Sequence, residues 1–523
     1  MQPNPAAVPA MIFLAAAVYG QPIASNNTFN VKDRGATGQR AGNATKAIQA
    51  AIDACTAAGG GIVYVPPGEY TTGAIQLKDN VNLYLEAGAT LFLSQDPADF
   101  TGRPRSMINS EGAKNIAVTG RGTIDGLAQY EYADMRGKDP EIEVERQIAA
   151  AAGIPMKRYY RTGMQTYMFI LNDSTGVRLE GITVIHSPLW NVRLNGCDRV
   201  FIRGVYIYSD LEKGVNADGI DIVSSSNVLI SDSIVVTGDD AIVVKTQGRG
   251  GQPAKPAENI TVTNCILTSS STPMEIGTET EADIRHVVFS NSVIRDSNRA
   301  FGINVQDGGT VSDIRFTNIT MDSRRRHWNW WGSAETFKFI IRKRNANSRL
   351  GAIRDIVIDN VIAHARGTSS LAGHPERPLE NIAISNLRMY MEPEDVPDKR
   401  ATDAIQVTDV KDLHLRNVSV VWDEGRPEGK WRSALRLRDV TGLDIDGFSG
   451  RQGLKSGTAA AIVLENVAGG VLQNLRATEG SGTFLEFRGP GNRQIWTRNN
   501  ELSKASKPEV FTVGAKRELI VLQ

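Results

Sequence analysis

Three aspartates stand in two acidic turns of the chain. Asp218 belongs to Asn216-Ala-Asp218, Asp239 and Asp240 belong to Gly238-Asp-Asp240, and Asp218 and Asp239 are 21 residues apart. Each turn is followed by a short run of alternating apolar residues that reads as a strand. If such units stack as parallel strands, equivalent positions lie roughly 4.8 Å apart. We therefore predict that Asp218 lies directly over the Asp239–Asp240 pair.

Carboxylates gathered on one outer face repel one another, and this repulsion should raise at least one pKa. A carboxyl group that keeps its proton near neutral pH can act as a general acid, while an ionised neighbour activates a water molecule. Such a set fits inverting hydrolysis of a glycosidic bond, in which acid and base are roughly 6.5–9.5 Å apart. Two other interpretations stay open, because both motifs are common turn sequences and clustered carboxylates also suit a calcium ion. We expect no metal and no cofactor.

The acidic turns lie among copies of a recurring unit, an apolar-alternating stretch with a small or polar residue at its centre. Half of the intervals between the starts of successive copies lie in the high twenties, with a full range of 23 to 42 residues, which is typical of a solenoid that absorbs insertions. Asn or Gly at the centre tolerates a left-handed backbone, and the repeated Asn can form a ladder between coils. The copies are Val177–Val184, Val200–Ile207, Val228–Val235, Ile260–Leu267, Val287–Ile294, Ile314–Met321, Ile356–Ala363, Ile382–Met389 and Leu413–Val420.

These features predict an all-β fold, a single-stranded right-handed parallel β-helix of nine or more coils. A propeller is not favoured, because it needs about four strands in every 40 to 50 residues. Residues 44–57 read as one amphipathic helix, with Ile48, Ala51, Ile52 and Cys55 on one face. We expect this helix to cover the N-terminal end of the solenoid, since an open end is an unpaired sheet edge.

Composition narrows the classes of partner. Lys+Arg and Asp+Glu both number 58, so the net charge is zero and a nucleic-acid partner is not expected. The three cysteines are widely spaced and predict neither a disulfide framework nor a zinc site. The short apolar run Pro9–Val18 predicts a signal peptide over residues 1–20, with one catalytic domain over 21–523. We expect a secreted or periplasmic protein without membrane contact after processing, more often a monomer than an oligomer.

The chain resembles glycoside hydrolase family 28, the polygalacturonase family of pectin-degrading β-helices, from about Phe29 to about residue 425. Its opening, with Asp33-Arg-Gly-Ala-Thr37 and Gly59-Gly-Gly-Ile-Val-Tyr-Val-Pro-Pro-Gly-Glu-Tyr70, is shared by many β-helix polysaccharide enzymes. Gly122-Thr-Ile-Asp-Gly126 and Ser187-Pro-Leu-Trp-Asn191 are more typical of the hydrolases. The two acidic turns match the family's Asn-Thr-Asp, with Ala217 for Thr, and its Gly-Asp-Asp. The resemblance implies that Asp239 is the general acid and that Asp218 and Asp240 orient and deprotonate the water.

Two of the family's cationic motifs are missing. The family's Gly-His-Gly aligns with a stretch that has Thr272 at the histidine position. Its Arg-Ile-Lys, which grips the galacturonate carboxylate, aligns with Asn304-Val-Gln306. The resemblance therefore implies retained acid machinery without the usual clamp, and little activity on unbranched polygalacturonate.

Further residues are candidates for contact with the sugar. Trp328, Trp330 and Trp331 cluster in the longest insertion beside Glu335, and aromatic faces can stack on sugar rings. The same region holds six basic residues, and one of their guanidinium groups could replace the missing clamp, although a solvated basic face is the simpler interpretation. They are Arg324, Arg325, Arg326, Arg342, Lys343 and Arg344. The predicted substrate-binding residues are Asn216, Lys245, Glu275, Gln306, Trp331 and Glu335.

The sequence thus predicts a hydrolase that acts on a pectic or other uronate-containing polysaccharide or oligosaccharide, with a rhamnogalacturonan-type linkage as one option. Two other classes stay open. A β-helix polysaccharide lyase would need a basic residue to abstract a proton and would release an unsaturated product. A carbohydrate-binding solenoid without catalysis would bind polysaccharides and release no product.

Overall fold

The computed structural model describes residues 27–128, 147–153, 164–325, 331–397, 399–455 and 457–522. The predicted signal peptide, Trp328 and Trp330 lie outside these ranges. Among the described residues, no helix is long and apolar enough to cross a membrane.

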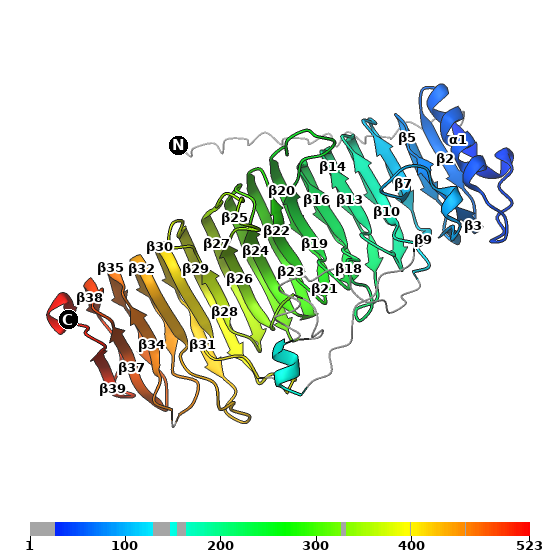
Figure 1. Cartoon of the computed structure of the whole chain (residues 1–523). Helices are drawn as coiled ribbons and strands as arrows, with labels where there is room; N and C mark the ends of the chain where they lie inside the picture. Colours follow the sequence, from blue (N-terminus) through cyan, green and yellow to red (C-terminus); the bar gives the residue numbers. More distant parts are fainter. Residues whose placement is uncertain are drawn as a thin grey trace, which may run out of the picture.

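The described chain winds into a parallel β-helix, an elongated stack of coils (Figure 1). One series of strands, called here the site sheet, pairs coil by coil in parallel register. It includes more than nine strands, so the predicted fold and number of coils are confirmed. Its strands are β7 (Ser106–Glu111), β10 (Tyr167–Asn172), β13 (Val192–Asn195), β16 (Ile220–Val223), β19 (Ile242–Thr246), β22 (Met274–Thr280), β24 (Arg299–Val305), β26 (Glu335–Ile341), β28 (Ser369–Ala372), β30 (Ile405–Arg416), β32 (Leu435–Asp446), β34 (Ala460–Glu465), β37 (Ser481–Arg488) and β39 (Ala505–Thr512).

A second series of strands is built from the recurring units found in the sequence. These strands also pair in parallel with the next coil. The series contains β11 (Thr175–Glu180), β14 (Asp198–Arg203), β17 (Ser226–Ser231), β20 (Ala257–Thr263), β23 (Ile284–Ser297), β25 (Thr310–Ser323), β27 (Ala352–Ala365) and β29 (Leu379–Met391).

The interior is filled by columns of apolar side chains, because alternate residues of every strand point inward. In the site sheet, Ile220, Ile242, Met274, Phe301 and Phe337 follow one another in register and are fully buried. Burying each such side chain stabilises the fold by roughly 1.5–3 kcal/mol. The column therefore fixes the strands that carry the acidic turns.

The central Asn of the recurring unit bends the chain, as the sequence predicted. Asn291, Asn318 and Asn360 have φ values of 48°, 56° and 52°, in the left-handed region. Asn318 Nδ2 donates to Asn291 Oδ1 at 3.0 Å, and Asn360 Nδ2 donates to Asn318 Oδ1 at 2.8 Å. The expected ladder is therefore present, and it is interrupted at Asn386, which donates to Asp359 instead.

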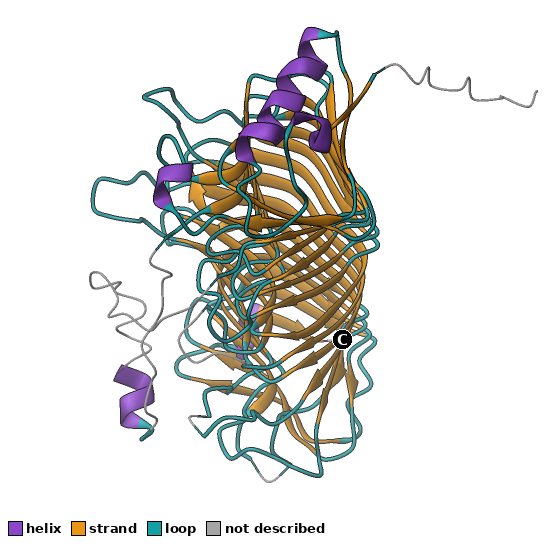
Figure 2. Ribbon diagram, turned by 90° about the vertical axis from the view of Figure 1, so that its right-hand side faces the viewer, coloured by secondary structure: helices purple, strands orange, loops and turns teal. Residues whose placement is uncertain are grey.

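Helix α1 (Thr45–Ala57) covers the N-terminal end of the stack (Figures 1 and 2). Its inward face buries Ile48, Ala51, Ile52 and Cys55, the residues that the sequence pattern placed together. Asn43 Oδ1 accepts a hydrogen bond from the backbone N–H of Thr45 at 3.0 Å and so supports the start of the helix. The predicted capping helix is confirmed. All three cysteines are buried and unpaired.

Candidate active site

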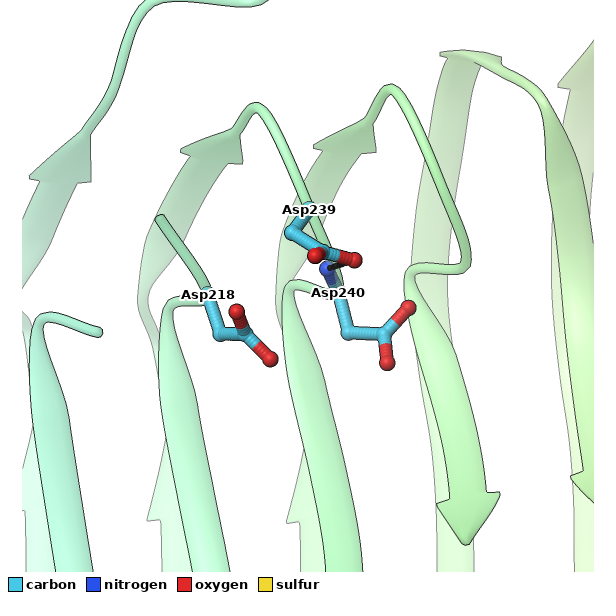
Figure 3. Close-up of side chains that lie close together, drawn as sticks. All are labelled: Asp218, Asp239 and Asp240. Atoms are coloured by element: carbon cyan, nitrogen blue, oxygen red, sulfur yellow. Dashed lines mark hydrogen bonds between the residues drawn. The ribbon is translucent and has the colours of Figure 1, made fainter. Parts of the chain in front are cut away.

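The two acidic turns lie on neighbouring coils at the start of strands of the site sheet. Asp218 precedes β16, and Asp239 and Asp240 lie between β18 (Ile234–Thr237) and β19. Because Ile220 pairs with Ile242, Asp218 lies next to Asp240 in register. One carboxylate oxygen from each aspartate lies within 4.8 Å of the others, and the three side chains converge (Figure 3). The predicted stacking of the turns is confirmed.

The three aspartates are far less exposed than an outer-face position implied. Asp218, Asp239 and Asp240 have exposed fractions of 2%, 4% and 9%. Side chains of neighbouring coils pack against them, Asn216 on Asp239 and Lys245 on Asp218. Burial therefore adds to repulsion in disfavouring charge on these three carboxyl groups.

Asp239 is held by its own turn and by the coil before it. Its Oδ1 accepts from the backbone N–H of Asp240 at 2.9 Å, and its Oδ2 accepts from Asn216 Nδ2 at 3.4 Å. Asn216 has a φ of 56°, a left-handed conformation that Asn tolerates. The hydroxyls of Thr237 and Ser269 donate to the Asp239 carbonyl at 2.7 and 2.6 Å. These contacts fix the carboxyl group in one direction.

Asp240 is oriented from the following coil. Its Oδ1 accepts from Ser271 Oγ at 2.7 Å and from the backbone N–H of Thr272 at 3.1 Å. Burial raises the pKa of Asp240, and the charge of Lys245 and these two hydrogen bonds work against the rise. Thr272, which stands at the family's histidine position, thus acts here through its backbone.

Lys245 supplies positive charge beneath the cluster. Its Nζ lies 3.0 Å from Asp221 Oδ1, 3.5 Å from Asp218 Oδ2 and 4.1 Å from the centre of the Trp190 ring. Burial opposes the charge, but Asp221 and Asp218 outweigh it and raise the pKa of Lys245 well above its usual range. Lys245 therefore contacts two aspartates of the site, and its predicted contact with substrate stays a prediction.

Asp221 is a buried site residue that the sequence reasoning did not single out. Burial raises its pKa to about 6 against the opposing charge of Lys245. The available signal was an acidic residue inside the apolar strand β16, immediately after the first turn. Burial, Asp221 and Asp239 together raise the pKa of Asp218 well above its usual range. The expectation that at least one pKa in the cluster is raised is confirmed, and such close groups titrate as a set rather than singly.

Glu275, Arg299 and Glu335 lie on the three coils that follow β19, with the arginine between the two glutamates. Arg299 Nε donates to Glu335 Oε1 at 2.8 Å, and Arg299 Nη1 lies 3.8 Å from Glu275 Oε2. Arg299 Nη1 also donates to Thr272 Oγ1 at 3.3 Å, which connects this group to the turn that holds Asp240. Glu335 is therefore engaged by protein partners, and its predicted contact with sugar stays a prediction.

Gln306 follows β24, two coils beyond β19. With its amide oriented to satisfy both partners, its oxygen accepts from Arg342 Nη2 at 2.9 Å and from Arg342 Nε at 3.2 Å. Arg342, from the next coil, thus brings a guanidinium group beside Gln306, which the alignment places where the family has a cation. Trp331 is half-buried at the edge of the described chain. The predicted contacts of Gln306 and Trp331 with substrate stay predictions.

The aspartate oxygens are close enough together to ligate a metal ion. The positive charge in contact with the described cluster is the ammonium group of Lys245, and one oxygen of Asp240 is engaged by Ser271 and Thr272. The expectation that this site holds no metal and no cofactor stays a prediction. Chemically, the cluster offers carboxyl groups with raised pKa values close together, within reach of one bound molecule.

Comparison with known proteins defines the class. The family model of glycosyl hydrolases family 28 matches residues 55–326, more than half of the chain, and the chain belongs to this family.

A probable polygalacturonase of Vitis vinifera is 26% identical over 376 residues, which cover 66% of this chain and 71% of that protein. A probable rhamnogalacturonase A of Aspergillus oryzae is 27% identical over 310 residues, and the match covers 57% of this chain but only 55% of that protein. The hyperthermoactive exopolygalacturonase of Thermotoga maritima has a TM-score of 0.61 and 23% identity, with 77% of this chain and 93% of that chain covered. This last likeness establishes a common fold.

Proposed function

We propose that this protein hydrolyses glycosidic bonds in a pectic or other uronate-containing polysaccharide or oligosaccharide. The observation that carries the proposal is the convergence of Asp218, Asp239 and Asp240 on adjacent turns of the site sheet. Family membership supports the reaction type. The names of relatives, a polygalacturonase and a rhamnogalacturonase, support the substrate class.

In the proposed mechanism, Asp239 protonates the leaving oxygen of the glycosidic bond. Asp218 and Asp240 hold the attacking water between them and accept its proton. The rigid support of Asp240 by Ser271 and Thr272, and of Asp218 by Lys245, favours the role of fixed acceptors. Protonation by a positioned acid contributes typically about 10²–10⁴ in rate.

We propose that the reaction inverts the anomeric configuration. The nearest oxygens of the cluster lie within 4.8 Å, closer than the roughly 6.5–9.5 Å between carboxyl groups that was expected for acid and base. In this proposal Asp218 and Asp240, on neighbouring coils, bind the water between them. The water therefore does not need to fit between the acid, Asp239, and a single base.

The substrate is proposed to differ from unbranched polygalacturonate. Thr272 and Gln306 stand where the family has cations, and Arg342 contacts Gln306 from the next coil. A cation supplied from the next coil would bind the carboxylate of an acidic sugar at a different place along the substrate. Such a sugar could be one that alternates with a neutral sugar, as in rhamnogalacturonan. The apolar run Pro9–Val18 supports a secreted or periplasmic location for this activity.

Product analysis on polygalacturonate, rhamnogalacturonan and other uronate polysaccharides tests the proposal. We expect saturated oligosaccharides from a rhamnogalacturonan-type substrate and little release from polygalacturonate. Rapid cleavage of polygalacturonate would overturn the substrate assignment. An unsaturated product that absorbs in the ultraviolet would indicate a lyase, and tight binding without any product would indicate a binding protein.

A further inference from the structure

Glu275 is a buried acid on the outward side of the site sheet. Glu275 is 4% exposed, and it lies in register between Val243 of β19 and Gly302 of β24. A Cβ atom on Gly302 would overlap Glu275 Oε2, so the glycine leaves the space in which this carboxyl group lies. Among the described residues, Oε2 has no hydrogen-bond partner. The position is therefore shaped around a carboxyl group that is not fully paired.

The charges around Glu275 are unbalanced. The cation within salt-bridge distance of Glu275 in the described chain is Arg299, at 3.8 Å, and Arg299 already pairs with Glu335 at 2.8 Å. Lys245 is engaged by Asp221 and Asp218. The charged groups that act on Glu275 are Asp240 and Lys245, from the turn before β19 and from β19, and Arg299 from β24. Glu335, the first residue of β26, pairs with Arg299, and Lys338 stands in the row of Glu275 beyond Gly302.

An acid in this environment holds its proton more tightly than an exposed glutamate. Burial and the charge of Asp240 raise the pKa of Glu275 to about 8, although Arg299, a hydrogen bond with Thr272 and Lys245 work in the opposite direction. The raised pKa favours the neutral form of Glu275.

We propose that Glu275 is a positioning residue that acts through Asp240: by remaining neutral, it leaves the negative charge of this buried pair on Asp240. Asp240 then accepts the proton of the attacking water and passes it to solvent after each turnover, while the proton of Glu275 stays in place. The proposal rests on the hydrolase function argued above. It gives a reason for a glutamate on the strand that follows Thr272, the position where the family has a histidine.

The protonation state can be measured without any substrate. Infrared spectra of the protein, with glutamate carboxyl groups labelled with carbon-13, should contain a protonated carboxyl band at pH 7 that titrates near pH 8. Glu275→Gln should remove this band. Glu486→Gln is the matched control, because Glu486 stands on the same register row in β37, is also buried, and pairs with Arg488 at 2.8 Å. Its spectrum should keep the band.

The pH profile of kcat/KM on a uronate-containing substrate tests the role. In the wild-type protein we expect a fall through an inflection near pH 8, because ionised Glu275 adds a second negative charge to the buried pair and changes the proton affinity of Asp240. Glu275→Gln should lose this inflection and keep the acid limb of the profile unchanged. An acid limb that moves to lower pH in Glu275→Gln would show that Glu275 is charged in the neutral range, and would overturn the proposal.

The two measurements separate the proposals. An unchanged infrared spectrum in Glu275→Gln, with hydrolysis intact, would refute the role of Glu275 and leave the hydrolase function standing. A wild-type protein that releases no product from any substrate would refute the hydrolase function, and with it the role of Glu275, whatever the spectrum shows about the proton. Should Glu275→Gln fail to fold, the titration of the labelled wild-type protein decides: no glutamate band titrating near pH 8 refutes the proposal.

Discussion

Lys245 Nζ and Asp221 Oδ1 lie 3.0 Å apart in a fully buried part of the site. Asp221 is in β16, after the first acidic turn, and Lys245 is in β19, after the second, so the pair connects the two coils beneath the acidic turns. Asp218 lies 3.5 Å from the same ammonium group. Lys245 thus compensates two carboxylates at once.

Lys245→Met should strongly destabilise the protein near neutral pH. Removing one partner of a buried ion pair leaves uncompensated charge and typically costs about 3–5 kcal/mol. Urea unfolding followed by tryptophan fluorescence measures the loss. The double variant Lys245→Met/Asp221→Asn is the control, and it should lose less than the sum of the two single variants. A Lys245→Met protein as stable as the wild type would contradict the charge balance described here.

Asp221→Asn should change how stability depends on pH. Because the pKa of Asp221 is raised to about 6 in the folded protein, the folded state binds this proton more tightly than the unfolded state. Its contribution to stability is complete below the unfolded pKa of about 3.9 and is lost as pH rises through about 6. The wild-type free energy of unfolding should therefore fall over this window relative to that of Asp221→Asn. Parallel curves for the two proteins would show that Asp221 is not perturbed.

Asn318 allows a stability test of the asparagine ladder. Asn318→Ala removes the bonds to Asn291 and Asn360 and places alanine at a φ of 56°. The left-handed conformation costs roughly 1–2 kcal/mol for such a residue, and each lost hydrogen bond costs about 0.5–1.5 kcal/mol. Asn318→Gly loses the bonds but tolerates the conformation, so it should be the less destabilised variant in thermal unfolding. Equal losses in both would mean that the backbone conformation contributes nothing.

Asp239→Asn should nearly abolish turnover. The substitution preserves shape and removes the proposed proton donor, which is typically worth about 10²–10⁴ in rate. Steady-state kcat and thermal unfolding should show lost activity with an intact fold. Asp218→Asn and Asp240→Asn should also be severe, through loss of the groups that activate water. Wild-type rates in Asp239→Asn would exclude it as the acid.

The sequence predicted those parts of the molecule that depend on repetition. Asp218 and Asp239 are separated by about the length of one coil, and this spacing predicted that the two turns lie on adjacent coils. The recurring Asn predicted the left-handed bends. The parts that depend on packing between coils were not predictable in this way. The burial of Asp240, the pairing of Lys245 with Asp221, and the sharing of Arg299 by Glu275 and Glu335 all require knowledge of which side chains meet across neighbouring strands.

The anomeric configuration of the first product tests the central claim most directly. Proton NMR during early hydrolysis of a rhamnogalacturonan-type substrate distinguishes the two anomers before they interconvert. We predict inversion, because Asp218 and Asp240 activate a water molecule instead of attacking the sugar. The nearest oxygens of the carboxylates lie within 4.8 Å of one another, closer than the separation expected for an inverting acid and base. The configuration of the product therefore decides between inversion and retention. A product with retained configuration would contradict the account, since it would show that one of these aspartates forms a covalent bond to the sugar.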